Sequence, residues 1–145
     1  MALPAKYIFI LGTLPFILLG AIHILYSLMD VRMPKKLTPH DDSVRLAMQK
    51  STLALTRQTT VWRAWLGFNI SHGIGVLFFG VIFLTLALDD FTLMSRVWLL
   101  PCLAVAVSTS YLVLSVKYWF RIPAVGSGIG AACFVAALVL LLGTA

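Results

Sequence analysis

Four long apolar stretches account for most of this chain, and their length constrains what it can fold into. They cover approximately residues 7–29, 64–88, 97–116 and 123–143. A helix needs about 20 apolar residues to cross the hydrocarbon core of a bilayer. The chain is 61% hydrophobic, whereas soluble domains are roughly 45–50% apolar. We therefore predict an all-α membrane protein, with four transmembrane helices in an antiparallel bundle that forms a single domain over residues 1–145.

The basic residues are distributed unevenly between the loops, which indicates an orientation in the membrane. Seven lie between the first two stretches and two between the last two, whereas Lys6 and Arg96 lie on the opposite side. Cytoplasmic loops carry an excess of Lys and Arg. We therefore expect both termini outside and the connector 30–63 in the cytoplasm, and we interpret the net charge of +6 as a topology signal rather than a nucleic-acid surface. The first stretch exceeds the apolar core of a signal peptide, about 7–15 residues, so we expect it to be retained.

The connector has a pattern of its own. Asp41, Asp42 and Ser43 are suited to cap a helix start, and residues 43–60 carry apolar side chains at roughly helical spacing. We predict an amphipathic helix at the cytoplasmic surface or an extension of the second span, and the sequence does not choose between them. The helix would be a solvated connector, a partner contact or a surface for anionic lipid headgroups, which clustered bases attract. The bases expected at headgroups are Lys35, Lys36, Arg45 and Lys50.

His23 and His72 lie inside the first and second stretches, where an ionisable side chain is costly and usually has a partner or a function. His23 lies seven residues before Asp30, and His72 lies nine residues after Arg63. At about 1.5 Å per residue, counted from the shared cytoplasmic side, their depths differ by only about 3 Å. We therefore predict a polar pocket in the cytoplasmic half of the bundle. Its further lining residues would be Asn69, Ser108, Tyr111 and Ser115.

Several roles are open for this pocket. It could be a hydrogen-bond cluster that fixes helix register, or a site for a quinone, a lipid or another small molecule. His23 and His72 could also ligate a haem iron from two helices. A site for a metal ion alone is poorly supplied, because the apolar stretches contain no carboxylate. Nucleophilic catalysis finds little support, since Ser71 and His72 are adjacent and point to different faces of a helix. His40 beside Asp41 and Asp42 is better explained by a turn and a helix cap than by a metal site.

Small residues indicate close helix packing. Gly126 and Gly130 form a G-x-x-x-G, a spacing that permits near approach of another helix, and Gly20 lies on the same face as His23. The partner would be a helix of the same chain or of another one, and the sequence does not separate the two. We expect Cys102 and Cys133 to be inert buried thiols.

The segment WRAWLGFNISHG, residues 62–73, resembles a stretch shared by uncharacterised small bacterial membrane proteins with four predicted helices. The preceding Met48, Ser51-Thr52 and Thr59-Thr60-Val61 are similar as well. The resemblance implies a four-span fold in a bacterial cytoplasmic membrane. It implies no activity and assigns no functional residues.

Together these patterns favour a non-catalytic membrane protein, an accessory subunit or scaffold that packs against other membrane chains or against itself. The alternative is a ligand-binding membrane protein that holds haem, a quinone or a lipid in a pocket lined by His23, Asn69, His72 and Tyr111. We expect no nucleic-acid partner, no metal site and no catalytic residues.

Overall fold

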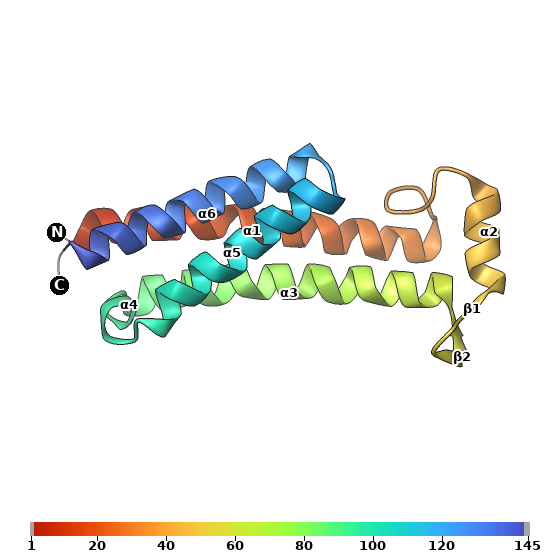
Figure 1. Cartoon of the computed structure of the whole chain (residues 1–145), viewed down its shortest axis with the longest axis horizontal. Coiled ribbons are helices and arrows are strands. Elements are labelled where there is room, and N and C mark those ends of the chain that lie inside the picture. The colour runs from red at the N-terminus through yellow and green to blue at the C-terminus, as the bar shows by residue number, and fades with distance from the viewer. Residues whose placement is uncertain (1, 144–145) are drawn as a thin grey trace. The chain divides into compact units, whose positions relative to one another are not determined.

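A computed structural model describes residues 2–143 and shows a chain that is mostly helical (Figure 1). In chain order its elements are α1 (Ala2–Arg32), α2 (Asp42–Lys50), β1 (Thr52–Leu53), β2 (Thr56–Thr60), α3 (Val61–Asp89), α4 (Leu93–Arg96), α5 (Leu99–Tyr118) and α6 (Arg121–Leu142). The helices α1, α3, α5 and α6 are each long and apolar enough to cross a membrane. The prediction of four helices of spanning length is thus confirmed.

The connector between α1 and α3 is only partly helical, so the prediction of a helix over residues 43–60 is wrong beyond Lys50. α2 ends at Lys50, and β1 then pairs with β2 in antiparallel fashion, with Thr52 opposite Thr60 and Leu53 opposite Thr56. Four of the nine residues from 52 to 60 are threonines. A β-branched side chain loses rotamer freedom in a helix and suits a strand. The connector therefore turns into a hairpin that leads directly into α3.

The chain forms two compact units. We call Gly20–Gly75 the connector unit. The terminal unit consists of the residues up to Leu19 and from Val76 onward. Because the unit boundaries fall inside α1 and α3, each of these two helices supplies one segment to each unit.

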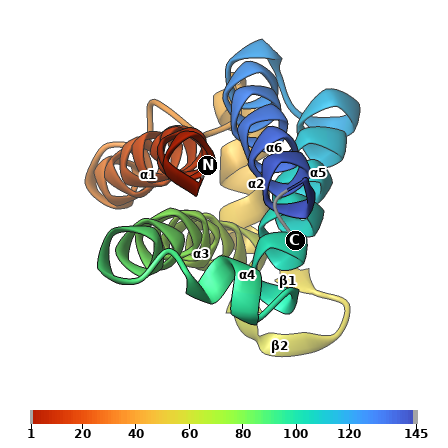
Figure 2. The same ribbon diagram turned by 90° about the vertical axis from the view of Figure 1, so that its left-hand side faces the viewer.

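Aromatic side chains form the centre of the terminal unit. The ring of Phe134 on α6 lies with its centroid 4.8 Å from that of Phe9 and 6.1 Å from that of Phe16, both on α1. Phe83 on α3 completes the group, 5.9 Å from Phe9. Such edge and offset contacts add to the gain from burying large apolar surfaces. In the same unit, α5 and α6 lie side by side (Figure 1), and α4 lies against α5 (Figure 2).

The G-x-x-x-G of α6 packs against α1 within the terminal unit. A Cβ placed at Gly130 would collide with the Phe16 ring and lie 3.0 Å from the carbonyl oxygen of Gly12. A Cβ at Gly126 would lie 2.7 Å from Leu19 Cδ1. Of the two partners that the sequence left open, a helix of the same chain is therefore the one that fills this surface. Gly20 is buried as well, in the connector unit.

The expectation of two buried thiols is wrong for Cys102, which is exposed, while Cys133 is half-buried. The buried face of α5 contains Ala104, Ser108 and Ser115. Position 102 does not belong to this row, since residues three or four apart share a helix face. The polar row of α5 is thus on the inside, and the thiol of Cys102 is on the outside.

Candidate functional site

Three polar side chains from α1 and α3 meet in the connector unit, and we call His23, Asn69 and His72 the His–Asn cluster. Nε2 of His23 lies 3.1 Å from Oδ1 of Asn69, which is a hydrogen-bond distance. The rings of His23 and His72 meet edge to face, with centroids 5.2 Å apart and planes at 75°. Asn69 is buried at 7% exposure, whereas both imidazoles are half-buried. The three residues are thus neighbours in the structure, as the similar depths counted from the sequence predict.

The orientation of the Asn69 amide fixes the proton on His23. Nδ2 of Asn69 donates to the carbonyl oxygen of Trp65, 2.9 Å away, one turn earlier in α3. Oδ1 therefore faces His23 and can only accept, so the hydrogen bond requires a proton on Nε2 of that ring. In neutral His23 this leaves Nδ1 as the acceptor. Nε2 is consequently committed to Asn69 and is not a ready ligand for iron or another metal.

α1 and α3 approach closely beside the cluster. A Cβ placed at Gly73 would lie 2.8 Å from Cγ1 of Ile24 and 3.2 Å from Cδ2 of His23. Two histidines that ligate one haem iron must stand on opposite faces of the flat macrocycle. With His23 and His72 in edge-to-face contact and Gly73 against α1, a macrocycle would enter between the rings only if the helices moved apart. The geometry therefore does not fit a haem held between these two histidines.

A hydrogen bond links the cluster to the connector. Nε1 of Trp65, whose backbone carbonyl accepts from Asn69, donates to the carbonyl oxygen of Leu37, 3.0 Å away. Three consecutive hydrogen bonds thus lead from the loop after α1 through Trp65 and Asn69 to His23. A second aromatic residue, Phe68, stacks on His72 with ring centroids 5.9 Å apart.

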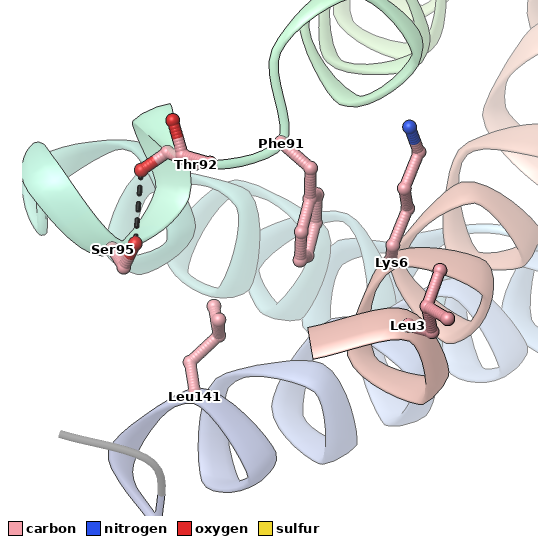
Figure 3. Close-up of a pocket in the computed structure, with 6 residues that line it drawn as sticks. All are labelled: Leu3, Lys6, Phe91, Thr92, Ser95 and Leu141. Carbon is pink, nitrogen blue, oxygen red and sulfur yellow. Dashed lines mark hydrogen bonds between the residues drawn. The ribbon is translucent and has the colours of Figure 1, made fainter. Parts of the chain in front are cut away.

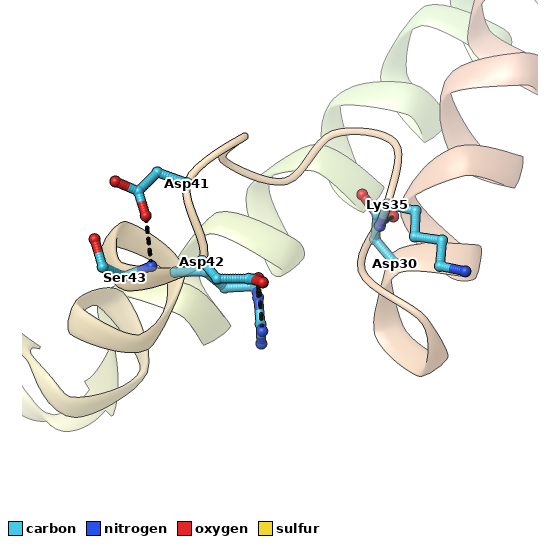
Figure 4. A network of polar contacts seen from close by, with 6 residues as sticks. Asp30, Lys35, Asp41, Asp42 and Ser43 are labelled. Atoms are coloured by element: carbon cyan, nitrogen blue, oxygen red, sulfur yellow. Dashed lines mark hydrogen bonds and ion pairs between the residues drawn. The ribbon is translucent and has the colours of Figure 1, made fainter.

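Asp30 closes the loop that follows α1, and sequence reasoning missed it. Its carboxylate is buried at 1% exposure and accepts hydrogen bonds from three consecutive backbone N–H groups. Figure 4 shows Asp30 beside the first of these residues, Lys35. The donors are Lys35 at 2.8 Å, Lys36 at 2.8 Å and Leu37 at 2.6 Å. From the sequence, Asp30 served only as the point from which the depth of His23 was counted. An aspartate shortly before a proline-containing turn is a signal for such a cap, because its carboxylate bonds readily to nearby backbone N–H groups.

A second aspartate starts α2 in the same region. Oδ1 of Asp41 accepts from the backbone N–H of Ser43 at 2.8 Å (Figure 4), as the capping pattern predicts. Hydrogen bonding from Ser43, first from its side chain and then from its backbone N–H, holds the pKa of the Asp41 carboxyl below its usual range. Asp42, next in the chain, pairs with Arg45 at 3.0 Å. These two residues thus serve the helix start.

The remaining predicted pocket residues belong to the terminal unit. The Tyr111 ring lies 6.0 Å from that of Phe16, and Oγ of Ser108 donates to the carbonyl oxygen of Val105 at 3.0 Å. Oγ of Ser115 is buried and has no hydrogen-bond partner among residues 2–143. The predicted pocket thus divides between the two units: the His–Asn cluster lies in one, and the α5 residues lie in the core of the other.

The bases expected at lipid headgroups have different surroundings. Arg45 forms the ion pair with Asp42, and Nζ of Lys36 lies 5.3 Å from the centre of the Tyr26 ring. Lys35 and Lys50 are exposed. Lys35, Lys36 and Lys50 thus keep their charges at the surface, whereas the charge of Arg45 is offset by its neighbour.

The terminal unit has a pocket of about 150 Å³ lined by Leu3, Lys6, Phe91, Thr92, Ser95 and Leu141 (Figure 3). The protons of its two hydroxyls are already used. Thr92 Oγ1 donates to Asp90, and Ser95 Oγ donates to the Thr92 carbonyl. A hydroxyl has one proton, so both hydroxyls can only accept from a ligand. Lys6 donates one of its three protons to the carbonyl oxygen of Leu88. A single cation does not make a binding site, and we assign the pocket no function.

Comparisons with protein-family models, with curated proteins and with solved structures find no match for this chain. The resemblance of residues 62–73 to small bacterial membrane proteins stays a prediction.

Proposed function

We propose that this is an integral membrane protein whose four long helices form an antiparallel bundle. The length and apolar character of α1, α3, α5 and α6 support this. Contacts within each unit fit the same arrangement: Gly73 of α3 lies beside Ile24 of α1 in the connector unit, and Gly80 lies beside Ile17 in the terminal unit. Within the terminal unit, Phe83 follows Gly80 along α3 and lies 5.9 Å from Phe9, which precedes Ile17 along α1, and this supports an antiparallel pair. The excess of bases in the connector supports an orientation with the connector in the cytoplasm and both termini outside. The bacterial cytoplasmic membrane that we propose is the one that the resemblance of residues 62–73 implies.

We infer further that the protein is non-catalytic and acts as an accessory subunit or scaffold. The main support is that polar side chains of the long helices form hydrogen bonds with other groups of the same chain. Asn69 is bonded at both ends of its amide, to His23 and to Trp65. Hydroxyl groups bond back to their own helices, as Thr13, Ser27, Thr85, Ser108 and Ser127 do. Of the bonds just named, the one between His23 and Asn69 joins two helices, and such interhelical hydrogen bonds contribute about 0.6–2 kcal/mol each. The hydroxyls that bond to their own helices have no proton left to donate to a substrate.

The outward faces of the long helices are apolar. Large side chains more than half exposed occur on each of them, for example Leu18, Phe78, Val116 and Val139. In a membrane such faces are covered by lipid or by other helices. A chain whose hydroxyls bond to their own helices and whose outward faces carry many large apolar side chains is suited to pack against membrane partners.

Extraction of the protein with its surrounding lipid tests this proposal. The full chain would be released from its membrane into copolymer-bounded lipid discs and weighed by native mass spectrometry. We expect particles in which this chain recurs with another chain, or with itself, in a fixed ratio. His23→Ala serves as an internal variant, since it changes a contact inside the chain and should leave the ratio unchanged. Recovery of a lone chain under several mild extraction conditions would overturn the accessory role.

Ligand binding is the second candidate, because both imidazoles of the His–Asn cluster are only half-buried and Phe68 stacks on His72. An imidazole beside an exposed aromatic ring can donate to a quinone or lipid oxygen. An absorption spectrum before and after reduction, with mass spectrometry of co-purifying small molecules, tests this. A bound molecule that is lost in His72→Ala while the fold survives would favour ligand binding over a purely structural cluster.

A further inference from the structure

The hairpin of the connector unit presents an apolar tip. β1 ends at Leu53 and β2 begins at Thr56, so Ala54 and Leu55 form the turn between them. Leu55 is 94% exposed. A single exposed leucine on a soluble surface needs no explanation. At a hairpin tip beside a membrane, however, the same side chain can leave water by entering the headgroup region.

α2 next to the hairpin has no buried residue. Val44 and Leu46 are each 47% exposed. In the connector unit α2 runs across the ends of the neighbouring helix segments rather than continuing either of them (Figure 1). If those segments lie along the membrane normal, α2 lies along the membrane surface, where an amphipathic helix binds.

The charges around α2 and the hairpin are predominantly positive. The exposed bases of the connector are Arg32, Lys35, Lys36, Lys50, Arg57 and Arg63. The acids nearby are engaged: Asp30 accepts from three backbone N–H groups, Asp41 caps α2 and Asp42 pairs with Arg45. A surface of this kind is complementary to anionic lipid headgroups, which attract bases close to a span.

The chain itself keeps the hairpin tip close to the bilayer. Leu55 precedes the start of α3 at Val61 by six residues. Six residues span at most about 20 Å even when fully extended. If α3 enters the membrane near Val61, Leu55 is therefore tethered within reach of the headgroups on the cytoplasmic side.

We propose that the tip of the β1–β2 hairpin docks on the anionic leaflet that surrounds the protein. Leu55 enters the headgroup region, and Arg57 and Lys50 lie over lipid phosphates. The docked surface is a phospholipid bilayer with acidic headgroups, and the connector is not merely solvated. This inference rests on the proposed membrane-spanning arrangement of α1 and α3.

A fluorescent probe at the tip tests the proposal in the full chain. Ala54→Cys in a Cys102→Ser, Cys133→Ser background carries an environment-sensitive dye and keeps Leu55. The protein is reconstituted in vesicles of phosphatidylcholine, with and without an equal part of phosphatidylglycerol. We expect blue-shifted emission and severalfold weaker quenching by aqueous iodide with phosphatidylglycerol present, and loss of that difference at high salt because screening weakens the attraction.

Two substitutions separate the apolar from the charged contribution. Leu55→Ser should restore iodide quenching in phosphatidylglycerol vesicles, and Arg57→Gln should shift the signal toward that in phosphatidylcholine. Gln58→Ser, at another exposed position of the hairpin, should change nothing. Equal quenching of the Ala54→Cys probe in both vesicle types, or no effect of Leu55→Ser, would overturn the docking proposal.

A second probe keeps this test separate from the proposed function. Ile82→Cys places the dye on the outward face of α3, where Ile82 is 48% exposed. Lipids that carry a quencher deep in their acyl chains should quench this dye if α3 spans the bilayer. Quenching at position 82 without protection at position 54 would reject only the docking. No deep quenching at position 82 would reject the spanning arrangement and, with it, the basis for docking.

Discussion

Nε2 of His23 donates its proton to Oδ1 of Asn69 across 3.1 Å, and this hydrogen bond joins α1 to α3 in the connector unit. The Trp65 carbonyl holds the Asn69 amide in the required orientation. The bond therefore does not depend on the charge of the imidazole, because Nε2 carries a proton in this neutral tautomer and in the cation alike.

Breaking this contact should destabilise the helix pair without removing the fold. We expect His23→Ala and Asn69→Ala each to lower the free energy of unfolding, with a coupling energy of about 1 kcal/mol between them in a double-mutant cycle. The measurement is reversible unfolding in mixed micelles. Ser71→Ala is the matched control, because its exposed hydroxyl bonds to its own helix at the carbonyl of Phe68. A coupling energy near zero would show that the cluster does not hold α1 and α3 together.

Removing the Asp30 carboxylate should open the loop after α1. Asp30→Ala leaves three backbone N–H groups without their acceptor, and we expect a loss of about 2 kcal/mol of stability. Hydrogen exchange at the amides of Lys35, Lys36 and Leu37 should accelerate together. Asp42→Ala removes only the surface ion pair with Arg45 and should cost less than about 1 kcal/mol. Unchanged exchange at the three amides in Asp30→Ala would contradict the assigned role of the carboxylate.

Glycine positions on α6 and α3 should respond in opposite ways to alanine. At Gly130 a new Cβ meets the Phe16 ring and the Gly12 backbone, so Gly130→Ala should destabilise the chain by about 1–3 kcal/mol. At Gly67 no heavy atom lies within 4 Å of the added Cβ. Gly67→Ala should therefore leave stability unchanged or raise it by up to about 1 kcal/mol, since alanine favours a helix. Thermal unfolding of both variants in one detergent is the measurement, and equal losses would argue against close packing at Gly130.

How much of the fold can be predicted depends on the element. The four long helices follow from the length and apolar content of their segments, which is the property that decides whether a helix can span a bilayer. The hairpin does not follow from apolar spacing, because the apolar positions of α2 continue past Lys50 while the threonines of β1 and β2 favour strands. In residues 52–60 the strand preference of threonine outweighed the helical spacing of the apolar residues. The number of threonines was therefore the signal that predicts the hairpin.

The sequence predicted the candidate site only where the depth of a residue in the membrane decides which side chains can meet. Depth along the membrane normal places His23 near His72, because the connector joins α1 and α3 at the same side of the membrane and both depths are counted from that side. Depth does not say which helices are neighbours, so the sequence could not indicate that the Tyr111 ring contacts Phe16 in the terminal unit. The grouping of Tyr111 with the histidines stays a prediction. Asp30 was missed for a different reason: its role comes from three backbone N–H groups of a loop whose conformation the sequence does not state.

The turn after α3 should show a specific pH response at Asp90. The hydroxyl and the backbone N–H of Thr92 donate to its carboxylate at 2.6 and 3.0 Å. These hydrogen bonds lower the pKa of Asp90 below its usual range, with smaller contributions from Arg96 and Lys6. A carboxyl whose pKa is depressed by folding stabilises the folded chain above its usual pKa, and the contribution is lost as the pH falls through the lowered value.

Thr92→Val removes the hydroxyl donor and should raise the pKa of Asp90 part of the way toward its usual range, because the backbone N–H remains. Carbon NMR titration of the Asp90 carboxyl in micelles is the measurement. Ser95→Ala is the control, since that hydroxyl donates to the Thr92 carbonyl and not to the carboxylate. A Thr92→Val titration that coincides with that of the parent chain would assign the depression to the backbone and the neighbouring bases rather than to the hydroxyl.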